Sequence, residues 1–261
     1  MKYQVQQNIR KQNLARITLS LSFLGSSLLI YIGFTIAYGV EVFSKDEQPF
    51  GIPYYEWVGK FWNWMVSLTE QQSQPPDGSC LINKSGTMVM LVDPSISGKH
   101  EFECDISSKD GLMIASWNGF FENNNKDDNE VPANTPAEQL SKMAKEQLDL
   151  GAVTSDVKVD GKSVAKLDEI TSMSPSNIVN TKVNTMDNFT EIYAKPFNVT
   201  IPEDTYLPGT VNGTWPSGGH GWFTFLKPLS PGDHKVSYTL SVQGLGADNV
   251  ASENTYTFHV K

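Results

Sequence analysis

The chain has 261 residues, of which 39% are hydrophobic, 11% aromatic and 19% charged, and its formal net charge is −9. This composition is typical of a folded, acidic protein and excludes a disordered tail, while the negative charge argues against nucleic acid as a partner. The length favours one domain with insertions. Charge is uneven along the chain, because four bases and no acid precede residue 17, which leaves −13 for the remainder.

An uncharged apolar run occupies residues 17–40, between the early bases and Glu41. At about 1.5 Å per residue, a helix over this run is long enough to cross a bilayer as a transmembrane or uncleaved signal-anchor helix. The basic flank predicts that residues 1–16 form a cytoplasmic tail and that the main domain is extracytoplasmic. We therefore expect a single-pass protein of the cell membrane, held there by residues 17–40. The alternative is a signal peptide cleaved near Ala37-Tyr38-Gly39, which would make the protein secreted.

Two cysteines, Cys80 and Cys104, lie on the predicted outer side. Disulfides form and persist in that environment, so we expect these cysteines to pair in a structural bridge. Two separate buried thiols are the alternative. A metal site would need further ligands, which the spacing does not supply.

Residues 41–53 combine charged residues with two prolines, which predicts a polar spacer between membrane and domain. In the Trp-rich segment that follows, residues 54–68, apolar side chains recur every three or four positions and predict a helix. A helix this aromatic is expected to pack on an adjacent sheet. The alternatives are an aromatic belt at the membrane surface or a helix that binds a protein partner through Trp57 and Trp64.

The extracytoplasmic domain, residues 54–261, contains short alternating runs between clusters of Gly, Pro, Asp and Ser, a pattern that predicts strands. Thr135 as N-cap and Pro136 at the first helical position predict an inserted helix over residues 136–150. Asp160-Gly161 predicts a two-residue hairpin turn. These features predict a mainly β fold, an Ig-like or jelly-roll-like β-sandwich with two accessory helices and one N-terminal transmembrane helix.

Common catalytic signatures are absent from the sequence. Gly161-Lys162-Ser163 is not a phosphate loop, because Asp156 occupies the position of the first required glycine. A nucleophile elbow and a His-Glu-x-x-His helix are also missing. We therefore assign no catalytic residue, no metal and no cofactor, and we favour a protein without catalytic activity.

Candidate binding residues are the aromatic and histidine side chains of a loop set expected around residues 215–222, together with the tryptophans of the Trp-rich segment: Trp215, His220, Trp222, Trp57 and Trp64. The glycines around His220 permit close approach of a ligand, although a glycine-rich turn before a core strand is the structural interpretation. Four acceptor sequons for N-glycosylation begin at Asn83, Asn188, Asn198 and Asn212.

The order of several motifs resembles a family of uncharacterised exported bacterial and archaeal proteins. These motifs are the Trp-rich segment, Cys80 before Ser85-Gly86, the second cysteine Cys104, Val-Asp-Gly-Lys at residues 159–162, Met-Ser-Pro at 173–175 and Pro-Leu-Ser-Pro-Gly-x-His at 228–234. The resemblance covers most of residues 54–243. It implies export and a β fold but no activity, and the long N-terminal helix departs from the soluble members.

Three functions are compatible with these features. The leading hypothesis is a membrane-anchored extracytoplasmic protein that acts as a cell-surface binding or assembly module, with an unknown ligand. The first alternative is an accessory subunit of a membrane protein complex, docked through the anchor and the Trp-rich helix. The second is an extracytoplasmic enzyme whose unrecognised site combines His220 with an acid such as Asp204 or Asp233.

Overall fold

The computed structural model describes residues 39–73, 75–92, 98–124, 131–148, 152–171, 184–207, 210–243 and 250–261. The predicted cytoplasmic tail, most of the predicted membrane span and the Met-Ser-Pro motif lie outside these residues. Within the described ranges, no helix is both long and apolar enough to cross a bilayer.

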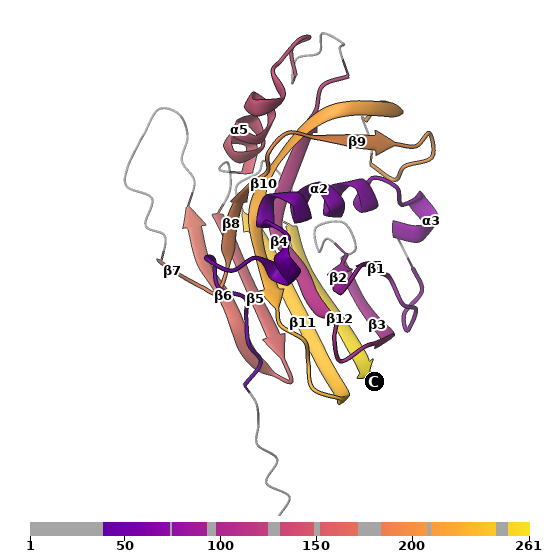
Figure 1. The fold of residues 1–261 in the computed structure, drawn as a ribbon, viewed down its shortest axis with the longest axis vertical. Helices are drawn as coiled ribbons and strands as arrows, with labels where there is room; N and C mark the ends of the chain where they lie inside the picture. The colour runs from indigo at the N-terminus through magenta and orange to yellow at the C-terminus, as the bar shows by residue number, and fades with distance from the viewer. Residues whose placement is uncertain are drawn as a thin grey trace, which may run out of the picture. The chain divides into compact units, whose positions relative to one another are not determined.

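Two six-stranded mixed sheets pack together in the described part of the chain (Figure 1). The first sheet has the order β1 (Ile82–Ser85), β2 (Met88–Leu91), β4 (Gly111–Glu122), β10 (Gly213–Leu226) and β8 (Thr190–Tyr193), with β9 (Phe197–Ile201) also paired to β10. The second has the order β3 (Lys99–Ile106), β12 (Val250–Val260), β11 (Gly232–Gln243), β5 (Ala152–Val159), β6 (Lys162–Thr171) and β7 (Asn184–Asp187). The prediction of a mainly β, two-sheet structure with few helices is confirmed.

The core lies between the sheets and follows the alternation of the strands. Every second side chain of β11 is buried from Val236 to Val242, as expected for a strand with one inward face. Tyr256 of β12 stacks on Phe102 of β3, with ring centroids 4.4 Å apart. Its hydroxyl donates to the carbonyl oxygen of Leu81 at 2.7 Å. Aromatic packing and satisfied polar atoms therefore occur together in the second sheet.

Helix α2 (Tyr54–Met65) covers the first sheet and lies inside the predicted range of 54–68 (Figure 1). Its own side chains Trp57 and Phe61 are buried, and the Phe61 ring packs edge-on against Phe223 of β10. Packing on the sheet is thus the role of its apolar stripe. The short helices η1 (Pro49–Gly51) and α3 (Glu70–Ser73) flank α2 in the sequence. Helix α5 (Ala137–Leu148) lies inside the predicted range of 136–150 and packs against β4 and β10.

The disulfide between Cys80 and Cys104 is confirmed. Cys80 immediately precedes the β1 region of the first sheet, whereas Cys104 lies on β3 of the second, so the bridge joins the edges of the two sheets. The cysteines are 24 residues apart, and closing a loop of this size stabilises a fold by about 3 kcal/mol through restriction of the unfolded chain.

The predicted spacer is corrected by the structure, because residues 41–53 pack on the domain. Val42 forms a β-bridge with Leu226 at the end of β10, and the Phe43 amide donates to the carbonyl of Phe225 at 2.8 Å. Charge and proline content predicted a spacer. The apolar side chains between the charged residues instead pack on the domain, which composition alone does not indicate. The predicted hairpin at Asp160-Gly161 joins β5 to β6, and both turn residues have positive φ, as a two-residue turn requires.

Candidate functional site

The predicted loop set around Trp215–Trp222 is the interior of a long strand, which corrects that expectation. Strand β10 pairs with β4 along one side and with β8 and β9 along the other. His220 is 0% exposed and Trp222 is 3% exposed. These two predicted site residues do lie together, since their ring centroids are 4.8 Å apart with nearly perpendicular planes.

Close packing explains two of the glycines around His220. A Cβ atom on Gly218 would lie 2.5 Å from the amide nitrogen of Ser141 in α5, and one on Gly221 would lie 2.4 Å from Cβ of Asn118 in β4. Both distances are shorter than van der Waals contact allows. These glycines therefore permit the helix and the neighbouring strand to approach β10, rather than leaving room for a ligand.

The buried His220 is hydrogen-bonded to the half-exposed Glu191 of the neighbouring strand β8. Its Nε2 donates to Glu191 Oε1 at 3.0 Å. This hydrogen bond is the main reason that the pKa of Glu191 lies below its usual value, and the nearby charge of Lys145 on α5 adds to the effect. Asp204 and Asp233 are the acids that were predicted from the sequence to accompany His220. The acid that contacts it is instead Glu191, and Asp233 pairs with His259 at 2.8 Å.

The accessible side of this pair is formed by β8. Tyr193 lies directly across from His220 in the strand register, and the two ring centroids are 4.5 Å apart. Tyr193 is 49% exposed, which makes it one of two large hydrophobic side chains exposed in the described residues. The Glu191 side chain is 40% exposed. An aromatic ring and a carboxylate thus reach solvent side by side, both held from below by one buried imidazole.

Unpartnered polar atoms follow one face of β10 beneath this surface. His220 Nδ1, Trp222 Nε1 and Thr224 Oγ1 are buried and have no hydrogen-bond partner within the described structure. Alternate residues of a strand share a face, so these atoms form a row. An unsatisfied buried polar atom typically costs about 1–3 kcal/mol, which makes this row a place where the sequence is not optimised for stability alone.

The remaining predicted binding residues are not part of the cluster. Trp57 is a buried residue of α2, and Trp64 is half-buried on the same helix, 6.2 Å from Phe61 between ring centroids. Helix α2 covers the opposite face of β10, because a Cβ atom on Gly219 would meet Val58. Trp215 lies near the start of β10, where its indole donates to the carbonyl of Val211 at 2.8 Å.

The predicted sequons differ in accessibility. Asn83 is half-buried on β1, whereas Asn188, Asn198 and Asn212 are exposed. The amide nitrogen of Asn188 donates to the carbonyl of Val164 at 2.8 Å. Asn198 and Asn212 carry no such side-chain donor bond to the backbone in the described structure, which makes them the more accessible acceptors.

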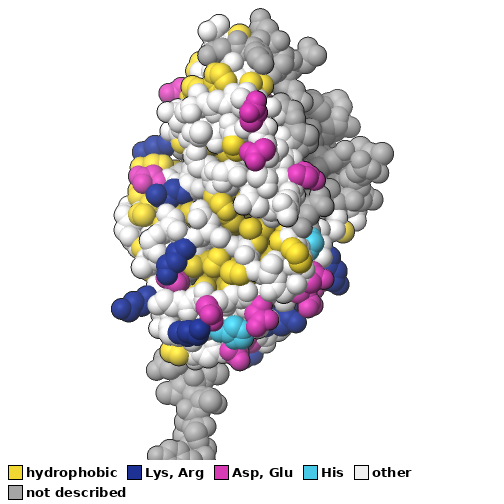
Figure 2. All heavy atoms as spheres, turned by 90° about the vertical axis from the view of Figure 1, so that its right-hand side faces the viewer, with side chains coloured by type: hydrophobic (Ala, Val, Ile, Leu, Met, Phe, Trp, Pro, Cys, Tyr) yellow, Lys and Arg dark blue, Asp and Glu magenta, His cyan; other side chains and the backbone are white. Residues whose placement is uncertain are grey.

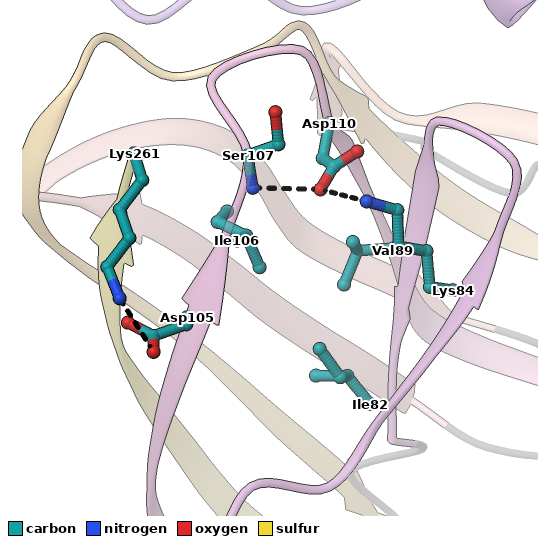
Figure 3. Close-up of a pocket in the computed structure, with 8 residues that line it drawn as sticks. All are labelled: Ile82, Lys84, Val89, Asp105, Ile106, Ser107, Asp110 and Lys261. Carbon is teal, nitrogen blue, oxygen red and sulfur yellow. Dashed lines mark hydrogen bonds and ion pairs between the residues drawn. The ribbon is translucent and has the colours of Figure 1, made fainter.

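A cleft of about 330 Å³ lies between β1–β2 and the β3–β4 connection (Figure 3). Lys84 Nζ contacts the buried carboxylate of Asp110 at 2.7 Å, and the Ser107 amide donates to the same oxygen at 2.9 Å. Lys261 pairs with Asp105 at 2.9 Å and holds the pKa of that carboxyl below its usual value. The charged groups that line this cleft therefore pair with one another, which is typical of a structural role. In the described ranges, no three His, Cys, Asp or Glu side chains are grouped to hold a metal ion.

Comparisons with known proteins identify no relative. No family model matches the chain, and no curated protein matches it. The solution structure of amebosin aligns at 10% identity over 62% of this chain and 96% of that chain, with a TM-score of 0.19. This score is too low for the likeness to carry an argument about fold or function.

Sequence reasoning missed Glu191 and Tyr193. The run Thr190-Glu191-Ile192-Tyr193 alternates polar and apolar residues, which is a strand signal. Nothing in the sequence, however, gives the register that pairs this short strand with His220.

Proposed function

We propose that this protein is a membrane-anchored extracytoplasmic binding module whose ligand contacts Tyr193 and Glu191. The observation that carries the proposal is the exposed Tyr193 ring beside a half-exposed carboxylate, both held by the buried His220. The disulfide supports a location outside the cytoplasm, and the uncharged run at 17–40 supports the anchor. An Ig-like or jelly-roll-like architecture also remains our proposal, although the parallel pairs β2–β4 and β12–β3 depart from fully antiparallel sandwiches.

The chemistry of the site favours an uncharged ligand rich in hydroxyl groups, such as a saccharide. The tyrosine ring offers a flat apolar face with a polar tip. Glu191 is an acceptor with two oxygens, and its lowered pKa keeps it ionised. An anionic ligand would be repelled by this carboxylate and by the acidic chain. In this arrangement His220 is a positioning residue, because it is fully buried and acts through Glu191.

Docking of a partner subunit through the Trp-rich helix has weaker support. The large side chains Trp57, Phe61 and Trp62 are buried against the protein's own sheet. Aromatic residues that anchor interfaces must be available to a partner, and these are already used in the core.

Titration of the full chain in detergent micelles with a panel of mono- and disaccharides tests the proposal. We expect at least one saccharide to bind, and Tyr193→Ala and Glu191→Gln each to weaken binding about tenfold or more, equivalent to about 1.4 kcal/mol. Tyr55→Ala, which changes a half-buried tyrosine of α2, is the matched control and should bind as the unchanged protein does. Equal loss in the control, or no binding by any saccharide, would contradict the proposal.

A further inference from the structure

The chain joins the domain at one end of β10 and is fixed there from its first described residues. The Lys227 amide donates to the carbonyl of Glu41, and the Phe43 amide donates to that of Phe225, both at 2.8 Å. Lys227 Nζ adds ion pairs to Glu41 at 3.4 Å and Glu47 at 3.1 Å. Within the described residues, the chain is therefore fixed to the end of β10 from residue 41 onward.

Three strand connections meet at this end, which we call the base. It comprises residues 39–41, the β3–β4 connection at 107–110, the β5–β6 turn at 160–161 and the β10–β11 connection at 227–231, and it lies at the lower end in Figure 1. Residues from all four parts line a hollow of about 540 Å³. His234 links two of these parts, because its Nδ1 contacts Asp160 Oδ2 at 2.8 Å and its Nε2 donates to the Ser230 carbonyl at 2.9 Å. The two motifs at residues 159–162 and 228–234 thus join to stiffen the base.

Most of the lysine side chains that lack a charged or aromatic partner in the described residues lie at the base. Among the described lysines, four form no ion pair, cation–π contact or other side-chain interaction within the described structure. They are Lys45, Lys109, Lys162 and Lys235. Each is exposed, and three of them belong to the base or adjoin it. Lys109 lies in the β3–β4 connection, Lys162 directly follows the β5–β6 turn, and the carbonyl of Lys235 accepts from the amide of Asp160 in that turn at 2.8 Å. Figure 2 shows basic, acidic and histidine side chains intermixed around this lower end. Unpaired cations on an otherwise acidic chain fit a surface that carries phosphate groups.

We propose that the base rests on the bilayer, with Lys109, Lys162 and Lys235 against the phosphates of lipid headgroups. This inference rests on the membrane anchor of the proposed function. The described chain enters the domain at the base, and the lysines there favour an orientation with the base towards the bilayer. The Tyr193–Glu191 surface belongs to the side of the sandwich and stays accessible to a ligand in this orientation.

Quenching of a fluorescent label by lipid tests the orientation in the full chain. Both cysteines are in the disulfide, so Ser230→Cys at the base and Glu203→Cys can each be labelled at a single position. Glu203 follows β9 near Gly213, the opposite end of the 14-residue β10, and is therefore about 40 Å from the base. The labelled proteins are reconstituted into vesicles of phosphatidylcholine and phosphatidylglycerol that contain headgroup-labelled quencher lipid.

We expect the label at position 230 to be quenched at least threefold more than that at position 203. Equal quenching would overturn the orientation. Flotation of the vesicles is measured first, because a chain that fails to float with them contradicts the anchor itself and removes this inference with it. A chain that floats but shows equal quenching overturns the orientation alone.

A second set of variants tests the lysines. Combined Lys109→Gln, Lys162→Gln and Lys235→Gln should reduce quenching at position 230 about twofold or more in vesicles with phosphatidylglycerol. The matched control combines Lys99→Gln, Lys142→Gln and Lys158→Gln, which removes three lysines that already have acidic partners. Unchanged quenching in the first set, or an equal reduction in the control, would overturn the role of the lysines.

Discussion

Large polar side chains on the inner faces of the two sheets differ in whether their buried polar atoms form hydrogen bonds. In the second sheet, the Tyr238 hydroxyl donates to the Val92 carbonyl and the Tyr256 hydroxyl donates to the Leu81 carbonyl, both at 2.7 Å. In the first sheet, Trp222 Nε1 and Thr224 Oγ1 are equally buried and have no partner in the described residues. The two tyrosine hydroxyls of the second sheet therefore help to hold the fold together, whereas the Trp222 and Thr224 side chains of β10 have hydrogen-bonding capacity that the described structure does not use. Ser252 Oγ on β12 of the second sheet is also buried without a partner in the described residues.

This difference indicates that β10 is not optimised for stability alone. A satisfied buried hydrogen bond contributes about 1 kcal/mol, whereas an unsatisfied group reduces stability. The unsatisfied row lies directly below the exposed Tyr193 and Glu191, on the same strand as His220. Unsatisfied polar groups beside an exposed aromatic ring and carboxylate are expected at functional sites.

The largest expected effect is that of His220→Ala. It removes the donor that Glu191 uses and leaves a cavity in the central strand, so we expect a loss of about 3 kcal/mol in the free energy of unfolding. Chemical denaturation of the full chain in detergent measures it. His220→Gln, which can still donate to Glu191, should lose less stability, and an equal loss would mean that packing rather than the hydrogen bond dominates.

Tyr238→Phe and Tyr256→Phe should each destabilise the protein by about 1–3 kcal/mol. Each substitution keeps the stacked ring and removes one hydroxyl, which leaves a carbonyl oxygen without that donor. Thermal unfolding compared with the unchanged protein gives the result. Stability unaffected by either change would erase the contrast between the sheets.

Thr224→Val should have a smaller effect of the opposite sign. The substitution replaces an unpartnered buried hydroxyl with a methyl group of similar size, so we expect a gain of up to about 1 kcal/mol. Denaturant midpoints of this variant and of Thr257→Val, which changes a half-buried threonine of β12 as control, make the comparison. A clear loss of stability would show that Thr224 has a partner during folding or in the folded protein.

The smallest effect concerns His259 on the outer face of the second sheet. Its ring nitrogens contact Asp233 at 2.8 Å and Glu103 at 3.0 Å, and these hydrogen bonds raise the pKa of His259 above 6.5, with that from Asp233 the larger. A group with a raised folded pKa contributes stability that is complete below its unfolded pKa and is lost as the pH rises through the folded value. We therefore expect the Tm to fall slightly between pH 6 and pH 9. In His259→Gln this part of the decrease should vanish, and an identical decrease would assign it to other groups.

Local patterns predicted the features whose causes are local. Helix α5, the hairpin at Asp160-Gly161 and the alternation of β11 each follow from signals within a few residues. The disulfide was predictable because only two cysteines exist. The strand character of β10 was hidden, because Pro216 and three glycines suggest turns, while the reason for the glycines is the close approach of α5 and β4.

Long-range pairings account for what the sequence did not predict. His220 and Glu191 are 29 residues apart and meet only through the register of β8 against β10. The docking of residues 41–53 similarly depends on a partner strand that ends at Leu226. In both cases, the sequence indicated which residue types were present, but it did not predict which distant residues they contact.

The docked segment at Val42 and Phe43 also determines how mechanical load enters the domain. Tension applied through the amino-terminal side of the chain would first act on the backbone hydrogen bonds that join this segment to Phe225 and Lys227. Those bonds lead into β10, the strand flanked by β4 on one side and by β8 and β9 on the other. A pull at this point would therefore be shared across the first sheet, rather than peeling away a strand at its edge.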